Sequence, residues 1–197
     1  LAVLSGLADL PKGFHLNGLS HLMYVDRRGA PENKQGGFST VEKSALLKAI
    51  ADWSSRVDSK VIVSEVNWPI QGAGLWSPIT GTYEKAEWRR DAPGETELDY
   101  ANFMLRFLAL TVCSGHVSEV YWWRLSARGY GLVDDQNGFA PRPAFTALKF
   151  FLHLLGDAVF VKKHDTPEDR YLLEFTQGAT RILMAWRVSG EQPLDGF

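Results

Sequence analysis

The chain has 197 residues, of which 45% are hydrophobic, and this is enough to bury one substantial core. Its 21 basic and 23 acidic residues are intermixed and leave a net charge of −2, which argues against a face for nucleic acid or anionic membrane. The single cysteine, Cys113, excludes an intramolecular disulfide framework and a cysteine-based zinc cluster. No run of about 18 apolar residues suggests a membrane span, and no feature indicates the cellular compartment.

Two apolar segments open the chain. Residues 1–7 predict a short buried strand, and residues 18–26 predict a second strand that ends at Asp26. A loop rich in glycine, proline and asparagine then extends to Phe38. The short apolar runs and the breakers between them favour strands over a long helix.

The first predicted helix begins at a capping box, with Ser39 as N-cap and Glu42 three residues later. Its apolar positions form one stripe that should face the core: Leu46, Ile50, Trp53 and Val57. A β-branched run at 61–66 follows after a short link and predicts a strand buried on both faces. This strand–helix–strand order predicts a parallel βαβ unit.

The later segments continue the alternation and then change it. A long connection at 67–96 leads to a helix at about 97–112 that Thr96 caps, a strand at 117–125 and a helix that begins near Pro143. Two half-apolar runs flank Gly178 and predict an antiparallel hairpin. We therefore expect an α/β body over residues 1–158 and a small antiparallel β unit over residues 159–197.

Chemically useful side chains gather where the predicted strands end, which is where α/β folds place their sites. Aromatic rings suit the apolar faces of sugars, whereas carboxylates, amides and arginine suit the hydroxyl groups. A carboxylate at a strand tip with aromatic walls is what a glycosidase requires. The candidate site residues are His21, Tyr24, Glu65, Asn67, Trp68, Trp76, Trp122, Trp123 and Arg124.

Four motifs carry a resemblance to a known group: Val-Ser-Glu-Val-Asn-Trp-Pro at 63–69, Val-Tyr-Trp-Trp-Arg-Leu at 120–125, Gly-Tyr-Gly-Leu-Val-Asp at 129–134 and Arg-Pro-Ala-Phe at 142–145. Residues 1–156 resemble the C-terminal half of clan A glycoside hydrolases, which include cellulase-like and β-xylosidase-like families. The resemblance implies a partial TIM (β/α)8 barrel, about strands five to eight, with retaining chemistry, no cofactor, no metal and a carbohydrate substrate.

The resemblance also implies individual roles. Glu65, at the end of strand seven, would be the nucleophile, and Tyr24 and His21, on strand six, would orient it. Trp122 or Trp123, at the end of strand eight, would form the floor of a sugar subsite. Residue alternation alone places those two tryptophans on opposite faces and does not decide between them.

The sequence departs from the clan in two places. The clan often has His-x-Tyr on strand six, whereas this chain has two residues between His21 and Tyr24, so the two should face opposite ways unless a bulge intervenes. The Asn-Glu dipeptide that carries the clan's acid/base is absent. We therefore expect a fragment that is inactive alone and needs the N-terminal half of the barrel, or another copy of the chain.

Other interpretations remain. Glu65 could be a structural ion-pair partner of Arg124 or Lys60. The whole chain could be a non-catalytic carbohydrate-binding or protein-interaction domain on the same scaffold, since exposed tryptophan and tyrosine also suit protein interfaces. The remaining histidines lack the spacing of a metal site.

Overall fold

The computed structural model describes residues 2–25, 29–73 and 94–188, except for the side chains of residues 2–4 and 35. Contacts divide the chain into two compact units, Leu1–Phe145 and Thr146–Phe197. Each unit is described by itself below. Among the described residues no helix has both the length and the apolar character needed to cross a bilayer.

The first unit alternates strands and helices. Its elements are α1 (Ala2–Ala8), β1 (Leu19–Leu22), β2 (Lys34–Gln35), β3 (Phe38–Ser39), α2 (Thr40–Trp53), β4 (Val61–Val66), α4 (Glu97–Cys113), β5 (Glu119–Trp122), β6 (Val133–Asp134), β7 (Ala140–Pro141) and the start of α5 (Pro143–Leu155). The boundary between the units falls within α5.

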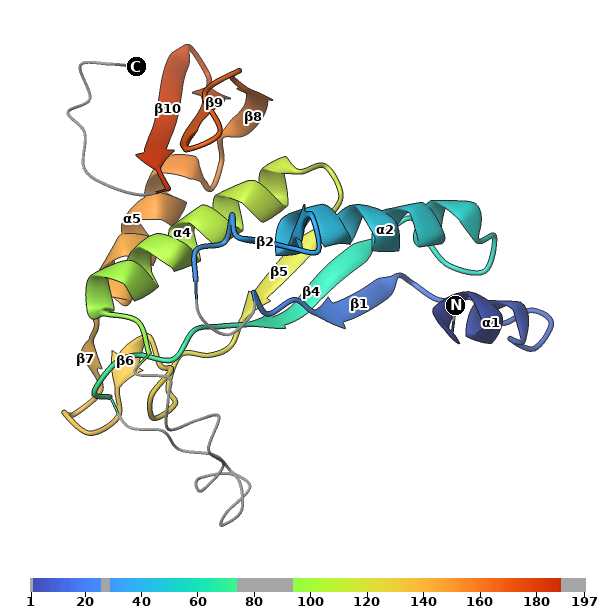
Figure 1. Ribbon diagram of the computed structural model, residues 1–197, viewed down its shortest axis with the longest axis horizontal. Helices are drawn as coiled ribbons and strands as arrows, with labels where there is room; N and C mark the ends of the chain where they lie inside the picture. The colour runs from blue at the N-terminus through green and yellow to red at the C-terminus, as the bar shows by residue number, and fades with distance from the viewer. Residues whose placement is uncertain (1, 26–28, 74–93, 189–197) are drawn as a thin grey trace. The chain divides into compact units, whose positions relative to one another are not determined.

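The centre of this unit is a parallel sheet with the strand order β1–β4–β5 (Figure 1). α2 connects β1 to β4 and α4 connects β4 to β5, and both helices pack on the sheet and on each other. The predicted parallel βαβ arrangement is confirmed. The sheet is open: among the described residues β1 and β5 each pair on one side only, so a closed barrel is not formed.

Local sequence signals set the two crossover helices. The side chain of Ser39 accepts from the backbone of Glu42, and the side chain of Glu42 accepts from the backbone of Ser39, so the predicted capping box is present. The side chain of Thr96 caps α4 by accepting from the backbone N–H of Asp99. Burial in α4 raises the pKa of the Cys113 thiol to about 11, which suits a structural cysteine.

Three expectations from sequence are wrong. The segment expected as the first strand forms α1, because a short apolar run suits either structure. The predicted stripe of α2 is buried only in part. Leu46 and Trp53 are 67% and 70% exposed and Ile50 is half-buried, while the buried Val57 lies after the end of the helix. The small side chains of Ser44 and Ala51 face inward instead, and they let the helix approach the sheet closely.

The third expectation concerns β4. Val61, Val63 and Val66 are fully buried, but Ser64 between them is exposed. The strand was expected to be buried on both faces, and only the face toward the helices is closed.

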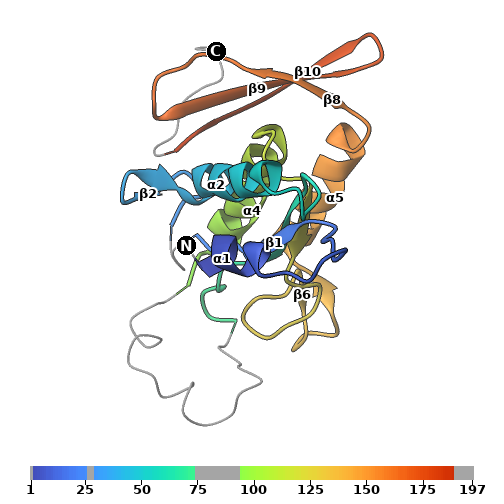
Figure 2. The ribbon, with the colours of Figure 1, turned by 90° about the vertical axis from the view of Figure 1, so that its right-hand side faces the viewer.

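The second unit contains the rest of α5 and a sheet of three antiparallel strands, β8 (Val159–Lys163), β9 (Arg170–Gln177) and β10 (Thr180–Arg187) (Figure 2). Strands β9 and β10 form the predicted hairpin, with Gly178 at a positive φ of 59° in the turn. Tyr171 and Trp186 lie opposite each other in this hairpin and stack at 4.9 Å. The expected antiparallel unit after an α/β body is therefore present.

Candidate functional site

Strand register distinguishes the two faces of the parallel sheet. Val61 and Val63 lie beneath the helices and are fully buried. Because side chains alternate along a strand, Ile62 and Ser64 point to the opposite face. On the neighbouring strand Tyr121 reaches the same side and is 56% exposed. We call this side the open face.

Glu65 reaches the open face through an irregularity in the ladder. His21 pairs with Val63, but the next residue, Leu22, pairs with Glu65, so β4 holds one extra residue between these two pairs. Glu65 thus shares a side with Leu22 and with Tyr24, two residues further on. The hydroxyl of Tyr24 donates a short hydrogen bond to Oε1 of Glu65. The predicted nucleophile and its predicted orienting residue are in direct contact.

His21 is placed differently. Its pairing with Val63 puts it on the side of the helices, and its ring Nδ1 lies 2.6 Å from the carbonyl oxygen of Leu22. The extra residue in β4 therefore brings Tyr24 to Glu65 and leaves His21 apart from both. This placement does not support a substrate contact for His21 beside Glu65.

Trp68 and Trp122 belong to the core between sheet and α4. Trp122 pairs with Val66, stacks on Trp68 at 5.7 Å and donates from Nε1 to the hydroxyl of Tyr100 at 3.2 Å. Trp68 is only 1% exposed, and its Nε1 donates to the carbonyl of Gly29 at 3.0 Å. Both tryptophans were expected to bind substrate, and their placement instead indicates packing.

The side chain of Trp123 points away from that of Trp122, and it forms an aromatic platform with Tyr130. Its ring meets that of Tyr130 edge to face, with centroids 5.6 Å apart. The guanidinium of Arg124 lies over the same indole, 5.1 Å from its centroid. The backbone N–H of Trp123 donates to the carbonyl of Val66 at 3.1 Å, one residue beyond Glu65. Trp123 and Tyr130, here called the Trp123–Tyr130 platform, thus follow the carboxyl end of the sheet.

Asn67 fixes the backbone of this platform. Its amide nitrogen donates to the carbonyl of Trp123, and to that of Tyr130 at 2.9 Å, while its Oδ1 accepts from the N–H of Trp68 at 2.6 Å. The residue is only 2% exposed. Because both amide hydrogens are used and the side chain is buried, Asn67 positions the platform and does not reach a substrate.

Asn67→Asp should destabilise the fold by about 2 to 4 kcal/mol, since a carboxylate cannot donate to two buried carbonyl groups. The free energy of unfolding, measured by urea titration, checks this. Asn137→Asp is the matched control, because Asn137 is exposed and its side chain makes no hydrogen bond among the described residues. A loss no larger than that of the control would contradict the role of Asn67.

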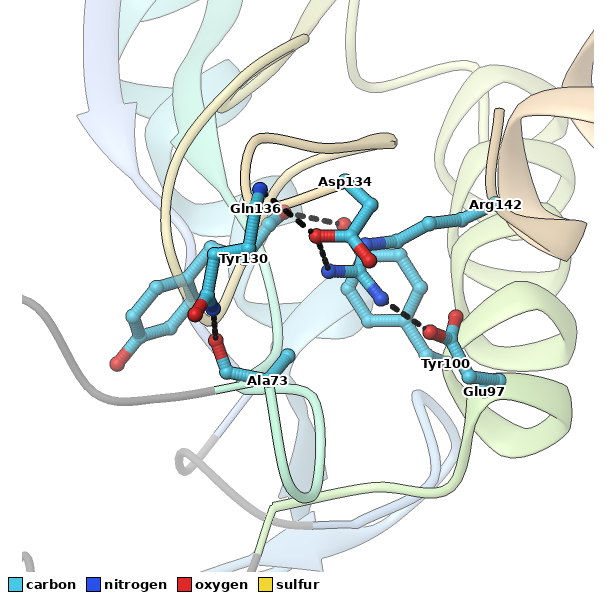
Figure 3. Close-up of polar contacts among 7 residues, drawn as sticks. All are labelled: Ala73, Glu97, Tyr100, Tyr130, Asp134, Gln136 and Arg142. Carbon is cyan, nitrogen blue, oxygen red and sulfur yellow. Dashed lines mark hydrogen bonds and ion pairs between the residues drawn. The ribbon is translucent and has the colours of Figure 1, made fainter. Parts of the chain in front are cut away.

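A second network holds the loop that carries Tyr130 (Figure 3). The hydroxyl of Tyr100 donates to the carbonyl of Tyr130 at 2.7 Å, and burial raises the pKa of Tyr100, which keeps this phenol a neutral donor. Arg142, only 9% exposed, binds Glu97 of α4 and lies 3.1 Å from Asp134 of β6. The loop that carries Tyr130 is therefore tied to α4 at two points.

The candidate residues chosen from sequence did not include Tyr130, Tyr100 or Arg142. The Gly-Tyr-Gly motif around Tyr130 is the signal that could have identified the loop. A Cβ on Gly131 would lie 2.7 Å from the backbone nitrogen of Ala127, so only glycine permits this close approach. The positions of Tyr100 and Arg142 depend on tertiary contacts that no local pattern records.

No second carboxylate is paired with Glu65 among the described residues, where the side-chain hydrogen bond of Glu65 is to Tyr24. Glu119 pairs with Ile62, three residues before Glu65, and at about 3.3 Å per residue this is roughly 10 Å along the strand. Lys60 binds Glu119 and lowers the pKa of its carboxyl. The alternative in which Lys60 or Arg124 pairs with Glu65 is not observed.

The candidate Trp76 lies outside the described residues, as does Asp26 at the end of the second predicted strand. Within the described ranges no group of three or more histidine, cysteine, aspartate or glutamate side chains could hold a metal ion. The site that remains is a carboxylate held by a phenol, followed along the same sheet edge by an aromatic pair and an arginine.

Comparison of the chain with models of protein families, with curated proteins and with solved structures gives no match. The function is therefore argued from the residues of this site.

Proposed function

We propose that Glu65 is the nucleophile of a retaining glycoside hydrolase and that the first unit supplies part of its (β/α)8 barrel. One observation carries the proposal: the hydrogen bond from Tyr24 to Glu65 at the carboxyl edge of a parallel sheet, on the open face. A phenol that donates to a carboxylate holds it in one orientation, which is what an attacking carboxylate needs.

In the proposed reaction Glu65 attacks the anomeric carbon while the glycosidic C–O bond breaks. A second carboxyl group protonates the leaving oxygen, and the same group later removes a proton from the water that hydrolyses the glycosyl–enzyme ester. The second group must lie about 5 to 5.5 Å from Glu65. We expect it on the N-terminal half of the barrel, or on another copy of the chain, and expect the isolated chain to be inactive.

The edges of the parallel sheet support this assembly. In the described residues β1 and β5 each present an unpaired side, and a barrel would close between them through further strands. In this proposal β1, β4 and β5 would be strands six, seven and eight of the barrel. On the outside of the unit, the exposed Leu46 and Trp53 of α2 would suit contacts with a neighbouring helix of such a barrel.

A non-catalytic carbohydrate-binding domain is the second candidate. It is favoured by one observation, that no second carboxylate is paired with Glu65 in the described part of the chain. The Trp123–Tyr130 platform would then bind sugar without cleavage.

Mechanism-based labelling separates the two candidates. The protein isolated from its source, in the form in which it occurs there, is treated with a panel of 2-deoxy-2-fluoroglycosyl fluorides and cyclitol epoxides. Mass spectrometry of its peptides should locate a covalent adduct on Glu65. Binding of oligosaccharides with no adduct on any residue would favour the binding domain. A protein that shows no oligosaccharide binding and forms no adduct would rule out both candidates.

Tyr24→Phe should lower kcat of that protein by about ten- to a hundredfold, because a hydrogen bond to a charged group contributes about 1.5 to 3 kcal/mol. Steady-state kinetics on the glycoside that labels best measures the change. Tyr121→Phe is the matched control, since Tyr121 bonds to Glu119 on the same face and should change kcat less than twofold. Equal effects of the two substitutions would count against Tyr24 as the orienting residue.

A further inference from the structure

Among the described arginines of the first unit, Arg124 is the one whose side chain has no acceptor. It is exposed, and its guanidinium lies over the indole of Trp123. Within the described residues this guanidinium makes no hydrogen bond or ion pair. Stacking on a ring leaves all five N–H donors of a guanidinium available for an acceptor.

The other four described arginines of this unit all bind oxygen atoms. Arg56 donates to the carbonyl groups of Leu10 and Pro11, Arg106 to Glu32, Arg128 pairs with Asp135, and Arg142 binds Glu97 and Asp134. Each of these four arginines thus has an oxygen partner, whereas the guanidinium of Arg124 keeps its donors available at the edge that carries Glu65.

Hydrogen bonds hold the residues around Arg124 in place. Trp123, beneath its guanidinium, is held by backbone hydrogen bonds to Val66 and Asn67. Tyr130, whose ring contacts the same indole, has its carbonyl held by both Asn67 and Tyr100. Two of these supporting residues, Asn67 and Tyr100, are buried, so the platform and the arginine are presented in a fixed arrangement.

An aromatic platform beside an unpaired guanidinium matches a sugar ring that carries a negative charge. The ring faces suit the C–H groups of the sugar, and the planar fork of donors suits a carboxylate or a sulfate. A neutral sugar would leave the charge of Arg124 without a partner.

We propose that the glycan bound beside Glu65 is anionic and that Arg124 binds its charged group, which is the carboxylate of a hexuronate or a sulfate ester. This inference rests on one part of the proposed function, the binding of a sugar. It concerns the charge of that sugar and does not require that the sugar is cleaved. Arg124 is assigned a role in specificity, next to the residue proposed to react.

A matched glycan array tests this with the native protein. The array holds gluco, galacto and manno oligosaccharides in three forms: neutral, oxidised to the 6-carboxylate, and 6-sulfated. We expect at least tenfold tighter binding of one charged form than of its neutral counterpart. A preference for the carboxylate series identifies a hexuronate, and a preference for the sulfate series identifies a sulfated sugar.

Substitutions assign the preference to its residue. Arg124→Gln should remove the preference for the charged form, and Arg124→Lys should retain part of it. Arg128→Gln is the control, because Arg128 is exposed and already paired with Asp135. Equal binding of charged and neutral forms would contradict the inference that the glycan is anionic and would leave the proposed function unaffected. Binding of no oligosaccharide at all would overturn this inference together with the proposed function.

Discussion

Glu65→Gln is expected to lower kcat of the native protein by at least about a thousandfold, because removal of a nucleophile from an assembled site has effects of this size or greater. The amide keeps the shape of the side chain and can still bond to Tyr24, but it cannot attack the anomeric carbon. Covalent labelling by fluoroglycosides should be lost as well. Steady-state rates and intact-protein mass spectra measure both effects.

Glu119→Gln is the matched control for this substitution. Glu119 lies on the adjacent strand and on the same face, but it is level with Ile62 and binds Lys60. Its replacement should change kcat less than twofold. If Glu119→Gln inactivates the protein and Glu65→Gln does not, the assignment of the nucleophile is wrong.

Arg106→Met should destabilise the fold by about 3 to 5 kcal/mol, because it removes the cation from a buried ion pair with Glu32. Both side chains are nearly inaccessible, at 10% and 4% exposure, and the guanidinium binds the carboxylate through two nitrogens. The pair ties the segment after β1 to α4, and this segment also supplies the carbonyl of Gly29 that binds Trp68. Urea unfolding measures the loss.

The double variant Glu32→Gln/Arg106→Met should recover much of that stability, because no charge is then left buried. Lys48→Met provides the comparison with an exposed pair, since Lys48 binds Asp52 at 2.5 Å one helical turn away. It should cost no more than about 0.5 kcal/mol. A loss for Arg106→Met as small as that for Lys48→Met would show that the buried pair does not hold this segment.

Much of the first unit follows from local signals. The capping box at Ser39, the cap at Thr96 and the β-branched run at 61–66 predict the helix–strand alternation that the structure contains. The face that α2 turns toward the sheet does not follow from local signals. Its larger apolar residues, Leu46 and Trp53, were taken as the inner stripe, yet the helix turns its small residues inward because they allow close packing on β4.

The site was predictable where it depends on order along a strand. The position of Glu65 near a strand end follows from the parallel arrangement, and the contact of Tyr24 with Glu65 agrees with the role that the resemblance implies. The sequence could not decide between Trp122 and Trp123, because the choice depends on which face of β5 meets α4. It also gave no sign of the extra residue in β4 that brings Glu65 to the side of Tyr24.

Residues that act through tertiary contacts were missed for the same reason. Asn67 was expected to bind sugar, but the fold brings two loop carbonyl groups to its amide from residues 56 and 63 positions further along the chain. Tyr100 and Arg142 reach the same loop from α4 and from the residue before α5. Such support can be seen only when strand register and loop path are known.

The proposal that Glu65 is a nucleophile is tested most directly by chemical rescue of Glu65→Gly. The native protein with this substitution is given an aryl glycoside and sodium azide, and the product is identified by NMR. We expect the azide to attack the anomeric carbon in place of Glu65, which releases the aryl group and forms a glycosyl azide of inverted configuration. Formation of no glycosyl azide, with turnover of the glycoside unchanged by the substitution, would contradict the proposal.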